Sequence, residues 1–359
     1  MNRIIFGGGF DPIHLGHINM ALQAQKTYPG EVIFVPAKVA VWKNDSIGAE
    51  HKLAMLSLAI KDYAGFSVDT FELEQKEQPR SYETVNYFKK KYPHDHLYFL
   101  IGQDQVNAFD QWIHPEIIAQ KCQIIYYKRP KCAINTANVD KYQMVAVEGP
   151  SIDVSSSDVR ELKSAYVPEE VLTYIEENSL YYINRIKPLI KESRFLHSVS
   201  VAHVAYRLAK RHQLDFSKAY IAGILHDIAK YFDKDESLRL MKEYYPEFVN
   251  IGAYAYHQFL GEMVAKNSFG ILDTDILLAI KYHTTGRKEM GWLEKLIYVS
   301  DKIEPTRQYD SSDLIKAMEN DFNSGFLTVL KANRDFLAKK NKDIDNYLSE
   351  ECFAFYLDA

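Results

Sequence analysis

The first residues able to do chemistry follow a short apolar stretch at the N-terminus. Three consecutive glycines, Gly7 to Gly9, let the backbone approach a ligand closely because they carry no Cβ. A helix expected to begin near Gly16 directs free N–H groups and the positive end of its dipole to the same point. His14 and His17 are three residues apart, so both can donate hydrogen bonds to a phosphate oxygen there. The segment therefore predicts a phosphate site rather than two core histidines.

A run of serines about 140 residues later could serve the same phosphates. Ser155, Ser156 and Ser157 stand at the expected start of a helix, where hydroxyls cap the helix and can also bind phosphate. Arg160, one turn further, adds a fixed cationic fork. Taken alone, the run predicts only a helix cap, so its assignment to phosphate depends on the first segment.

Together, the two segments resemble the signatures of the nucleotidyltransferase superfamily. Residues 7–17 read GGGFDPIHLGH and match the pattern GGxFDPxHxGH, while residues 154–160 resemble ISSTxxR, with serine at 157 for the usual threonine. The resemblance implies an in-line transfer of AMP from ATP, with Mg²⁺, onto a phosphate acceptor. The residues it assigns to ATP are Gly7, Gly8, Gly9, Phe10, His14, His17, Ser155, Ser156, Ser157 and Arg160, of which His14, His17 and Arg160 are also given catalytic roles.

Four local features resemble, more narrowly, the bacterial nicotinate-mononucleotide adenylyltransferases. They are Gly102-Gln103-Asp104 with Trp112 eight residues on, the turn at 81–84, Arg129-Pro130, and the tail at 167–181. A carboxylate can bind a ribose hydroxyl and an indole can face a pyridine ring, although Trp112 could equally belong to the core. The predicted acceptor-binding residues are Thr84, Gly102, Asp104, Trp112 and Arg129.

One stretch departs from that family. Members carry Pro-Pro-His-Lys after the second strand, whereas residues 36–43 read PAKVAVWK, with Trp42 in place of the histidine. The lysine is kept as Lys43, and we predict a catalytic role for it. Nicotinamide mononucleotide and phosphopantetheine are alternative acceptors.

A second group of candidate ligands lies in the other half of the chain. Gaps of 29, 31, 26 and 18 residues separate His197, His226, His257, His283 and Asp301 in turn. Each gap is about the length of a helix plus a loop, so separate helices could bring these residues to one centre. Imidazole with carboxylate suits Fe, Mn or Zn, and a bridging aspartate suits two ions. The members are His197, His226, Asp227, His257, His283 and Asp301, whereas we interpret His203 and His212 as surface histidines.

The order H…HD…H…H…D resembles the HD superfamily of metal-dependent phosphohydrolases. Residues 282–287 and 293–305 look like the bacterial HD enzymes that hydrolyse diadenosine tetraphosphate symmetrically to two ADP, although Lys302 stands where a tyrosine is frequent. The resemblance implies that one metal is held by His197, His226, Asp227 and Asp301, with Asp227 central to catalysis, and that His257 and His283 face a second metal or the substrate phosphate. The predicted phosphate-binding residues are Lys230, Thr284 and Arg287. Another nucleotide substrate, or a non-catalytic nucleotide-binding regulatory module, is the alternative.

The elements that must position these residues divide the chain into two domains, 1–184 and 185–359. Expected strands at 4–6, 32–35, 97–101, 124–127 and 145–147 alternate with amphipathic helices at 17–26, 50–61, 83–91 and 157–164. This alternation predicts a Rossmann-like α/β domain with a parallel sheet covered on both faces. From residue 185 the patterns are helical, including an apolar stripe with Phe195 and Leu196, which predicts an all-α half. The resemblance above implies that this half is an HD-domain bundle.

Composition narrows the class of protein. The chain has 359 residues, 47% of them hydrophobic, with 43 Lys and Arg against 48 Asp and Glu, so a polyanion-binding surface is not expected. It lacks a run of about 18 apolar residues, so no membrane span is expected. The apolar stretch at its start is shorter than the apolar core of a signal peptide, so no signal peptide is expected either. Three cysteines without a CxxC pair favour the cytoplasm. The expected partners are ATP, nicotinate mononucleotide and diadenosine tetraphosphate, and a homo-oligomer is compatible with the sequence.

Overall fold

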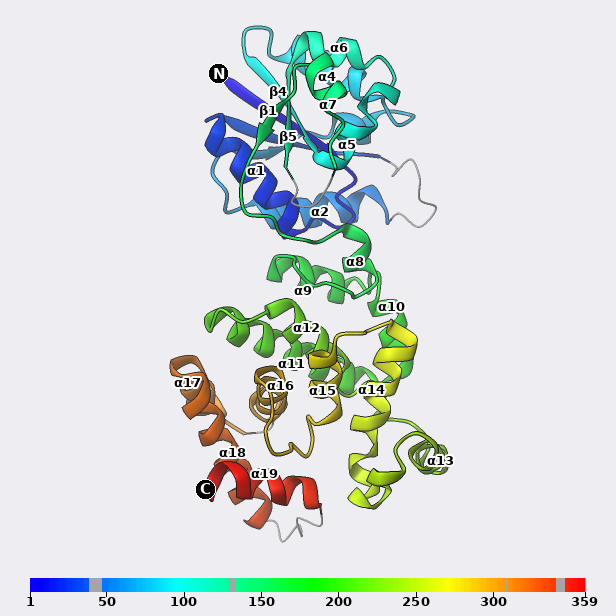
Figure 1. Cartoon of the computed structure of the whole chain (residues 1–359), viewed down its shortest axis with the longest axis vertical. Coiled ribbons are helices and arrows are strands. Elements are labelled where there is room, and N and C mark those ends of the chain that lie inside the picture. The colour runs from blue at the N-terminus through cyan, green and yellow to red at the C-terminus, as the bar shows by residue number, and fades with distance from the viewer. Residues whose placement is uncertain (39–46, 129–132, 308, 340–345, 359) are drawn as a thin grey trace. The chain divides into compact units, whose positions relative to one another are not determined.

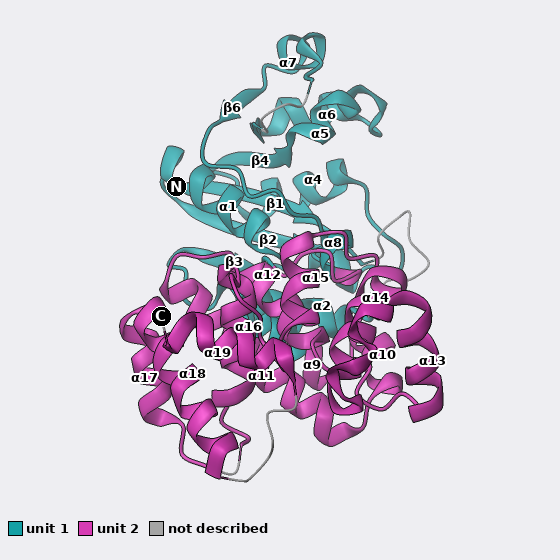
Figure 2. Ribbon diagram, turned by 60° about the horizontal axis from the view of Figure 1, so that its bottom comes forward, with its two compact units in different colours: residues 1–159, 166–174 teal, residues 160–165, 175–359 magenta. Residues whose placement is uncertain are grey.

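The computed structural model describes residues 1–38, 47–128, 133–307, 309–339 and 346–358. They form two compact units, residues 1–159 with 166–174 and residues 160–165 with 175–359 (Figure 2). The chain therefore passes between the units at three places, and the boundary after residue 184 stays a prediction. Among the helices in the described ranges, none has the length and apolar composition needed to cross a membrane.

The first unit contains a six-stranded sheet in which every neighbouring pair is parallel (Figure 1). In spatial order the strands are β3 (Phe66–Val68), β2 (Glu31–Pro36), β1 (Asn2–Gly8), β4 (His96–Gly102), β5 (Gln123–Tyr127) and β6 (Val145–Val147). The five expected strands are confirmed. The strand β3 was missed because its three residues are all half-buried and Ser67 interrupts any apolar run.

Helices cover both faces of this sheet, as expected for parallel strands. One core joins alternate strand residues such as Ile5, Ile33 and Phe99 to Val85 and Phe88. The helices of this unit are α1 (Leu15–Thr27), α2 (Ala49–Ile60), α3 (Phe71–Glu74), α4 (Ser81–Lys91), α5 (Gln103–Asn107), η1 (Phe109–Gln111), α6 (Pro115–Lys121) and α7 (Thr136–Lys141), followed by α8 (Ser156–Arg160) and α9 (Glu169–Glu177), which extend into the second unit.

The helix expected at 157–164 is shorter than predicted. It ends at Arg160, and Leu162 adopts the left-handed conformation with φ of 59° while its side chain is fully buried. A left-handed leucine cannot continue a right-handed helix, so the chain turns at this point.

The described residues of the second unit form α-helices and short 3₁₀ helices and contain no strand, which confirms the expected all-α half. The elements are α10 (Ile183–Ile186), η2 (Lys187–Leu189), α11 (Glu192–Arg211), α12 (Phe216–Leu225), α13 (Lys234–Tyr244), η3 (Pro246–Ile251), η4 (Ala253–Ala255), α14 (Tyr256–Phe269), α15 (Thr274–Lys281), α16 (Trp292–Ile303), α17 (Ser312–Asn320), α18 (Phe322–Lys339) and α19 (Tyr347–Leu357).

The packing of α11 on α12 depends on small residues. A Cβ at Gly223 would lie 2.6 Å from the Cα of Ala202, so only glycine permits this approach. The expected apolar stripe of α11 is wrong at Leu196, which is 54% exposed. The buried arc of the helix there runs through Phe195 and His197 and leaves Leu196 on the opposite side.

Two candidate active sites

The two histidines of the first predicted site lie at the end of the loop between β1 and α1 and in the first turn of α1. His14 is the N-cap of α1, and its Nδ1 accepts the backbone N–H of His17 at 3.3 Å. The Nδ1 of His17 in turn accepts the backbone N–H of His14 at 3.4 Å, and the rings stack with centroids 3.6 Å apart. Because each Nδ1 is an acceptor, each neutral ring carries its proton on Nε2. Both side chains are therefore hydrogen-bond donors at Nε2, as a phosphate site requires.

Glycines in this loop have two different roles. A Cβ at Gly16 would lie 3.0 Å from Nδ1 of His14, and one at Gly8 would lie 3.0 Å from the ring of Phe10, so packing excludes larger residues. A Cβ at Gly7 or Gly9 would meet no atom of the described residues within 4 Å. Protein packing does not explain those two glycines, whereas close approach of a ligand does.

The serine run is adjacent to this loop. The hydroxyl of Ser156 donates to the carbonyl of Pro12 at 2.9 Å, and Val154 lies beside Gly16. The hydroxyl of Ser155 caps α8, since it contacts Asp158 Oδ2 at 2.5 Å and accepts the N–H of Asp158 at 3.1 Å. The structure thus brings together two segments that are far apart in the sequence, with Ser157 and Arg160 on the same short helix.

Sequence reasoning missed a buried lysine next to this loop. The side chain of Lys52 on α2 is fully buried, and its Nζ donates to the carbonyls of Ala37 and Lys38 at 2.9 and 3.2 Å. Burial lowers the pKa of Lys52, an effect that Asp11 opposes. Lys52 fixes the backbone that leads into the stretch containing Lys43, but Lys43 and Trp42 lie outside the described residues. The signal in the sequence that could have revealed its burial is the position of this lysine within an apolar helical pattern.

The predicted acceptor residues lie around the carboxyl end of β4 and on α4. Asp104 is exposed in the first turn of α5, two residues after the end of that strand. Trp112 is half-buried against Phe109, with ring centroids 4.9 Å apart. Thr84 is buried and its hydroxyl donates to Glu72 at 2.7 Å. Gly102 ends β4 as the N-cap of α5, whereas Arg129 is outside the described residues. Acceptor binding by these residues stays a prediction.

In the second unit, the structure brings all six predicted metal ligands together. Each is at most 8% exposed. His197 comes from α11, His226 and Asp227 follow α12, His257 is in α14, His283 follows α15, and Asp301 is in α16. The separate-helix arrangement expected from the sequence spacing is therefore the one observed.

The carboxylate of Asp227 lies at the centre of this cluster. Its Oδ2 is 3.4 Å from Nε2 of His226 and 3.9 Å from Nε2 of His197. Its Oδ1 is 3.1 Å from Nε2 of His257 and 3.4 Å from Nε2 of His283. Asp227 thus belongs to two three-residue groups that could each hold a metal ion. Asp301 adds an oxygen 3.1 Å from Nε2 of His197.

The Nδ1 nitrogens of these histidines, which face away from the centre of the cluster, are fixed by hydrogen bonds. Nδ1 of His226, His257 and His283 contacts the carbonyl three residues earlier in each case, at 2.7, 2.9 and 2.8 Å. A carbonyl only accepts, so Nδ1 carries the proton and Nε2 offers its lone pair to the centre. His197 instead contacts Glu304 through Nδ1 at 2.8 Å. Glu304 was not among the predicted site residues, although a carboxylate behind a ligand histidine is a frequent second partner.

The donor set fits a divalent metal. Nε2 of His226 and Oδ1 of Asp227 are buried and have no hydrogen-bond partner among the described residues. Burial lowers the pKa of His257, and it lowers that of His283 to about 3. Burial alone would raise the pKa of Asp227, but the neighbouring imidazoles hold it well below its ordinary value. Asp227, His257 and His283 are therefore in the deprotonated forms that metal ions need. Burial alone would lower the pKa of His197 as well, but hydrogen bonds to Asp301 and Glu304 outweigh that effect, so its pKa is instead raised.

Two of the three predicted phosphate-binding residues lie at this centre. Nζ of Lys230 is 3.0 Å from Nε2 of His257, and Oγ1 of Thr284 is 3.0 Å from Nε2 of His283. Arg287 is engaged elsewhere, because Glu294 holds it through two hydrogen bonds of 2.6 and 2.8 Å. Its role in phosphate binding stays a prediction.

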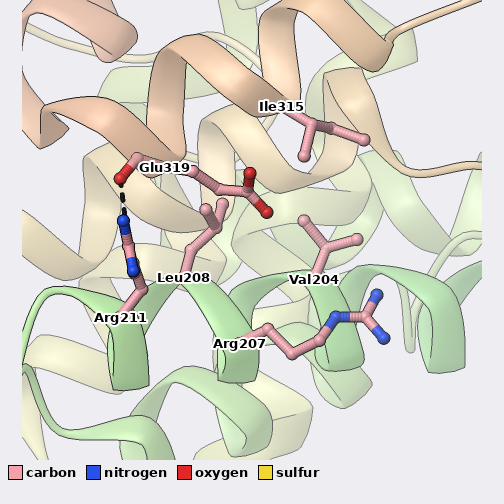
Figure 3. Close-up of a pocket in the computed structure, with 6 residues that line it drawn as sticks. All are labelled: Val204, Arg207, Leu208, Arg211, Ile315 and Glu319. Carbon is pink, nitrogen blue, oxygen red and sulfur yellow. Dashed lines mark hydrogen bonds between the residues drawn. The ribbon is translucent and has the colours of Figure 1, made fainter.

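Two other features lie away from the metal ligands. A cavity of about 550 Å³ on α11 and α17 is lined by residues that include Val204, Leu208 and Arg211, and none of the predicted site residues lines it (Figure 3). The expectation of surface histidines at 203 and 212 is wrong. Nε2 of His203 is 2.9 Å from the buried carboxylate of Glu176, and that of His212 is 2.6 Å from the carbonyl of Met318.

Comparison with known proteins matches the two halves of the chain to two different families. The cytidylyltransferase-like family model matches residues 5–162, and the HD domain model matches residues 194–306. A symmetrical bis(5'-nucleosyl)-tetraphosphatase of Bacillus subtilis is 37% identical over 169 residues, which cover 46% of this chain and 91% of that protein.

Two relatives match both halves at once. A probable nicotinate-nucleotide adenylyltransferase/Ap4A hydrolase of Mycoplasma genitalium is 31% identical over 339 residues, covering 91% of this chain and 96% of the relative. Its counterpart in Mycoplasma pneumoniae is 30% identical over 347 residues, covering 91% and 98%. The chain therefore belongs to the family in which a nicotinate-nucleotide adenylyltransferase is joined to an HD-domain Ap4A hydrolase.

Proposed function

We propose that the chain is a bifunctional enzyme of nucleotide metabolism. The first unit transfers AMP from ATP to nicotinate mononucleotide, giving deamido-NAD and pyrophosphate. The second hydrolyses diadenosine tetraphosphate to two ADP. Family membership over almost the whole chain supports both activities together.

The adenylyl transfer is supported most directly by the paired histidines at the start of α1. Their Nε2–H groups and the N-terminus of the helix form a donor set for the phosphates of ATP. In the proposed reaction a phosphate oxygen of the acceptor attacks the α-phosphorus while the bond to the bridging oxygen of pyrophosphate breaks. The histidines stabilise the charge that develops, and no protein nucleophile is needed. Mg²⁺ bound by the nucleotide would neutralise further charge.

The acceptor can be tested with the full-length chain. Pyrophosphate release from ATP should require an acceptor, and nicotinate mononucleotide should give a higher kcat/KM than nicotinamide mononucleotide or phosphopantetheine. Equal kcat/KM for the two pyridine mononucleotides would contradict the proposed acceptor. Pyrophosphate release without any acceptor would contradict direct transfer.

The hydrolase activity is supported by the shared carboxylate of Asp227, whose two oxygens each face two imidazole nitrogens. His197, His226, Asp227 and Asp301 would hold one ion, and His257 and His283 with Asp227 a second. We infer Fe as the native metal, with Mn or Zn as alternatives that suit the same donors. Such ions, when bound, would activate water and neutralise phosphate charge. The carbonyls and the carboxylate that bind Nδ1 orient the ligand histidines, and burial of the cluster excludes bulk water from it.

Product analysis tests the hydrolase. The metal-loaded chain should convert diadenosine tetraphosphate to ADP alone, whereas asymmetric cleavage would give ATP and AMP. Nucleotide binding without turnover by the loaded chain would favour a regulatory module instead.

Buried free thiols at Cys122 and Cys352 support the cytoplasm as the compartment.

A further inference from the structure

The cavity between α11 and α17 has no part in either proposed reaction. Its volume is about 550 Å³, and all of its lining residues come from these two helices (Figure 3). Ligand pockets in proteins commonly measure about 300–1,000 Å³, so this cavity has room for a small organic molecule. The lining consists of Val204, Arg207, Leu208 and Arg211 on α11 and of Ile315 and Glu319 on α17.

The central part of the lining is apolar. Val204 and Leu208 are four residues apart on α11, so they occupy the same face of that helix. Both are buried, and Ile315 on α17 is half-buried. These three aliphatic side chains form a surface that the flat face of an aromatic ring can cover, which would remove apolar area from water.

Charged side chains surround this apolar surface. Arg207 and Arg211 are exposed and lie one turn apart on α11, and the exposed Glu319 adds a carboxylate from α17. Figure 3 shows that this carboxylate points away from the guanidinium of Arg211. The carboxylate forms no hydrogen bond or ion pair with any described residue. The cavity therefore presents cations and an unpaired anion around one apolar surface.

One of these side chains also has a structural role. The carbonyls of Met318 and Glu319, near the end of α17, accept hydrogen bonds from Nε2 of His212 at 2.6 Å and from Nε of Arg211 at 3.3 Å. The last carbonyls of a helix lack helical partners, so these two contacts cap α17 and hold it against α11. Capping explains Nε of Arg211. It explains neither the orientation of the Glu319 carboxylate nor the apolar surface.

The charges restrict the kind of ligand. A guanidinium binds phosphate through paired N–H donors, whereas a carboxylate accepts hydrogen bonds from amino groups such as those on adenine and cytosine. A ligand that suits both must carry an anion at one end and N–H donors at the other, with a flat ring between them. Each phosphate beyond the first would add negative charge near Glu319, so a nucleoside triphosphate should fit less well than a monophosphate.

We propose that this cavity binds a nucleoside monophosphate whose base carries an exocyclic amino group. The phosphate pairs with Arg207 and with the Nη groups of Arg211. The base covers Leu208 and Ile315, and its amino group donates to Glu319. The ligand thereby connects α11 with α17, and its binding needs no metal ion. This site goes beyond the two proposed reactions and does not depend on either of them.

The test is a calorimetric titration of the full-length chain in EDTA, without metal ions. The probes are AMP, ATP and inosine 5′-monophosphate, which lacks the amino group. The variants are Arg207→Gln, Glu319→Gln and Ile315→Trp, of which the last fills the cavity. A nucleotide site elsewhere in the chain is left intact in Ile315→Trp, so the difference between wild type and this variant isolates the cavity. Lys316→Gln is the control, because Lys316 is an exposed cation of α17 that pairs with Asp313 and does not line the cavity.

Wild type should bind AMP at the cavity more tightly than inosine 5′-monophosphate or ATP, and Ile315→Trp should lose this binding. Arg207→Gln should weaken AMP binding by about tenfold or more, the usual size for a charge-assisted contact. Glu319→Gln should reduce the difference between AMP and ATP, since the amide still accepts a hydrogen bond but no longer repels phosphate. Lys316→Gln should behave as wild type.

Four results would overturn the assignment. They are equal AMP binding in wild type and Ile315→Trp, an unchanged affinity in Arg207→Gln, ATP binding at the cavity as tightly as AMP, and inosine 5′-monophosphate binding there as tightly as AMP. Thermal melting without ligand shows whether each variant is folded. If Ile315→Trp is unfolded, Arg207→Gln and Glu319→Gln decide the question, because both of these residues are exposed.

Discussion

In the first unit, His14 and His17 each use Nδ1 to accept a backbone N–H, whereas in the second unit His226 and His283 each use Nδ1 to contact a backbone carbonyl. The difference follows from which end of a helix is near. The start of α1 has N–H groups without helical partners, while the ends of α12 and α15 have carbonyls without them.

This contrast prepares the same side chain for two kinds of chemistry. A ring whose Nδ1 accepts presents a proton on Nε2 and suits a phosphate, whereas a ring whose Nδ1 donates presents a lone pair and suits a metal. His257 follows the second pattern although it lies at the start of α14, because the carbonyl of Tyr254 in the preceding 3₁₀ helix η4 accepts its proton. The local backbone therefore assigns the function of each imidazole.

The largest expected effect separates the two sites outright. Asp227→Ala removes the carboxylate shared by both groups of metal ligands, so it should abolish metal retention and reduce hydrolysis by more than the ~10–100-fold typical of residues behind the ligands. Adenylyl transfer should persist. Metal analysis and both activity assays measure this, with Asp275→Ala, an exposed aspartate of the same unit, as the control. Normal hydrolysis by Asp227→Ala would refute the metal-centre assignment.

The complementary change is in the first unit. His17→Ala removes one Nε2 donor, so kcat for adenylyl transfer should fall by ~2–4 kcal/mol in barrier, or about 30- to 1000-fold, with a smaller change in KM. Hydrolysis and metal content should not change. His114→Ala, an exposed histidine of the same unit, is the matched control. Wild-type turnover by His17→Ala would contradict a transition-state role.

A residue that orients a ligand tests the second unit more finely. Glu304 contacts Nδ1 of His197, and its own pKa is lowered to about 2 although burial opposes that shift. Glu304→Gln should weaken metal binding by ~10–100-fold while keeping the shape of the side chain. Competition with a chelator measures this, with the exposed Glu350→Gln as the control. If metal affinity in Glu304→Gln equals that of Glu350→Gln, the carboxylate does not support His197.

Much of this arrangement could be predicted from the sequence, because it depends on residue type and spacing. The six ligands, five of the six strands and the proximity of His14 to His17 all follow from periodicity and helix length. The tautomers could not be predicted, since they depend on which backbone group lies within 3.5 Å of each Nδ1. Likewise Arg287 has the residue type that phosphate binding needs, and only the structure shows that Glu294 holds its guanidinium. Lys52 was missed and Leu196 was misjudged because helical periodicity does not say how many neighbours a helix has.

The smallest expected effect is a difference in pH dependence within the metal-free second unit. His283 is 1% exposed, and its pKa falls from the ordinary 6.5 to about 3 because burial disfavours the charged ring. Between these values the unfolded chain binds a proton that the folded chain does not, so stability falls as pH decreases from 6.5 towards 3.

That loss is at most ~1.4 kcal/mol per pH unit for one proton. His283→Gln should therefore have a lower melting temperature at pH 7, but its melting temperature should decline less steeply than that of the wild type as the pH falls. Calorimetry of the metal-free chain measures this, and the transition that added metal raises identifies the second unit. His114→Gln, in the other unit, should keep the wild-type slope for this transition. An equal slope in His283→Gln and wild type would mean that His283 is not held neutral by burial, and the contrast between the two kinds of histidine would then rest on hydrogen bonding alone.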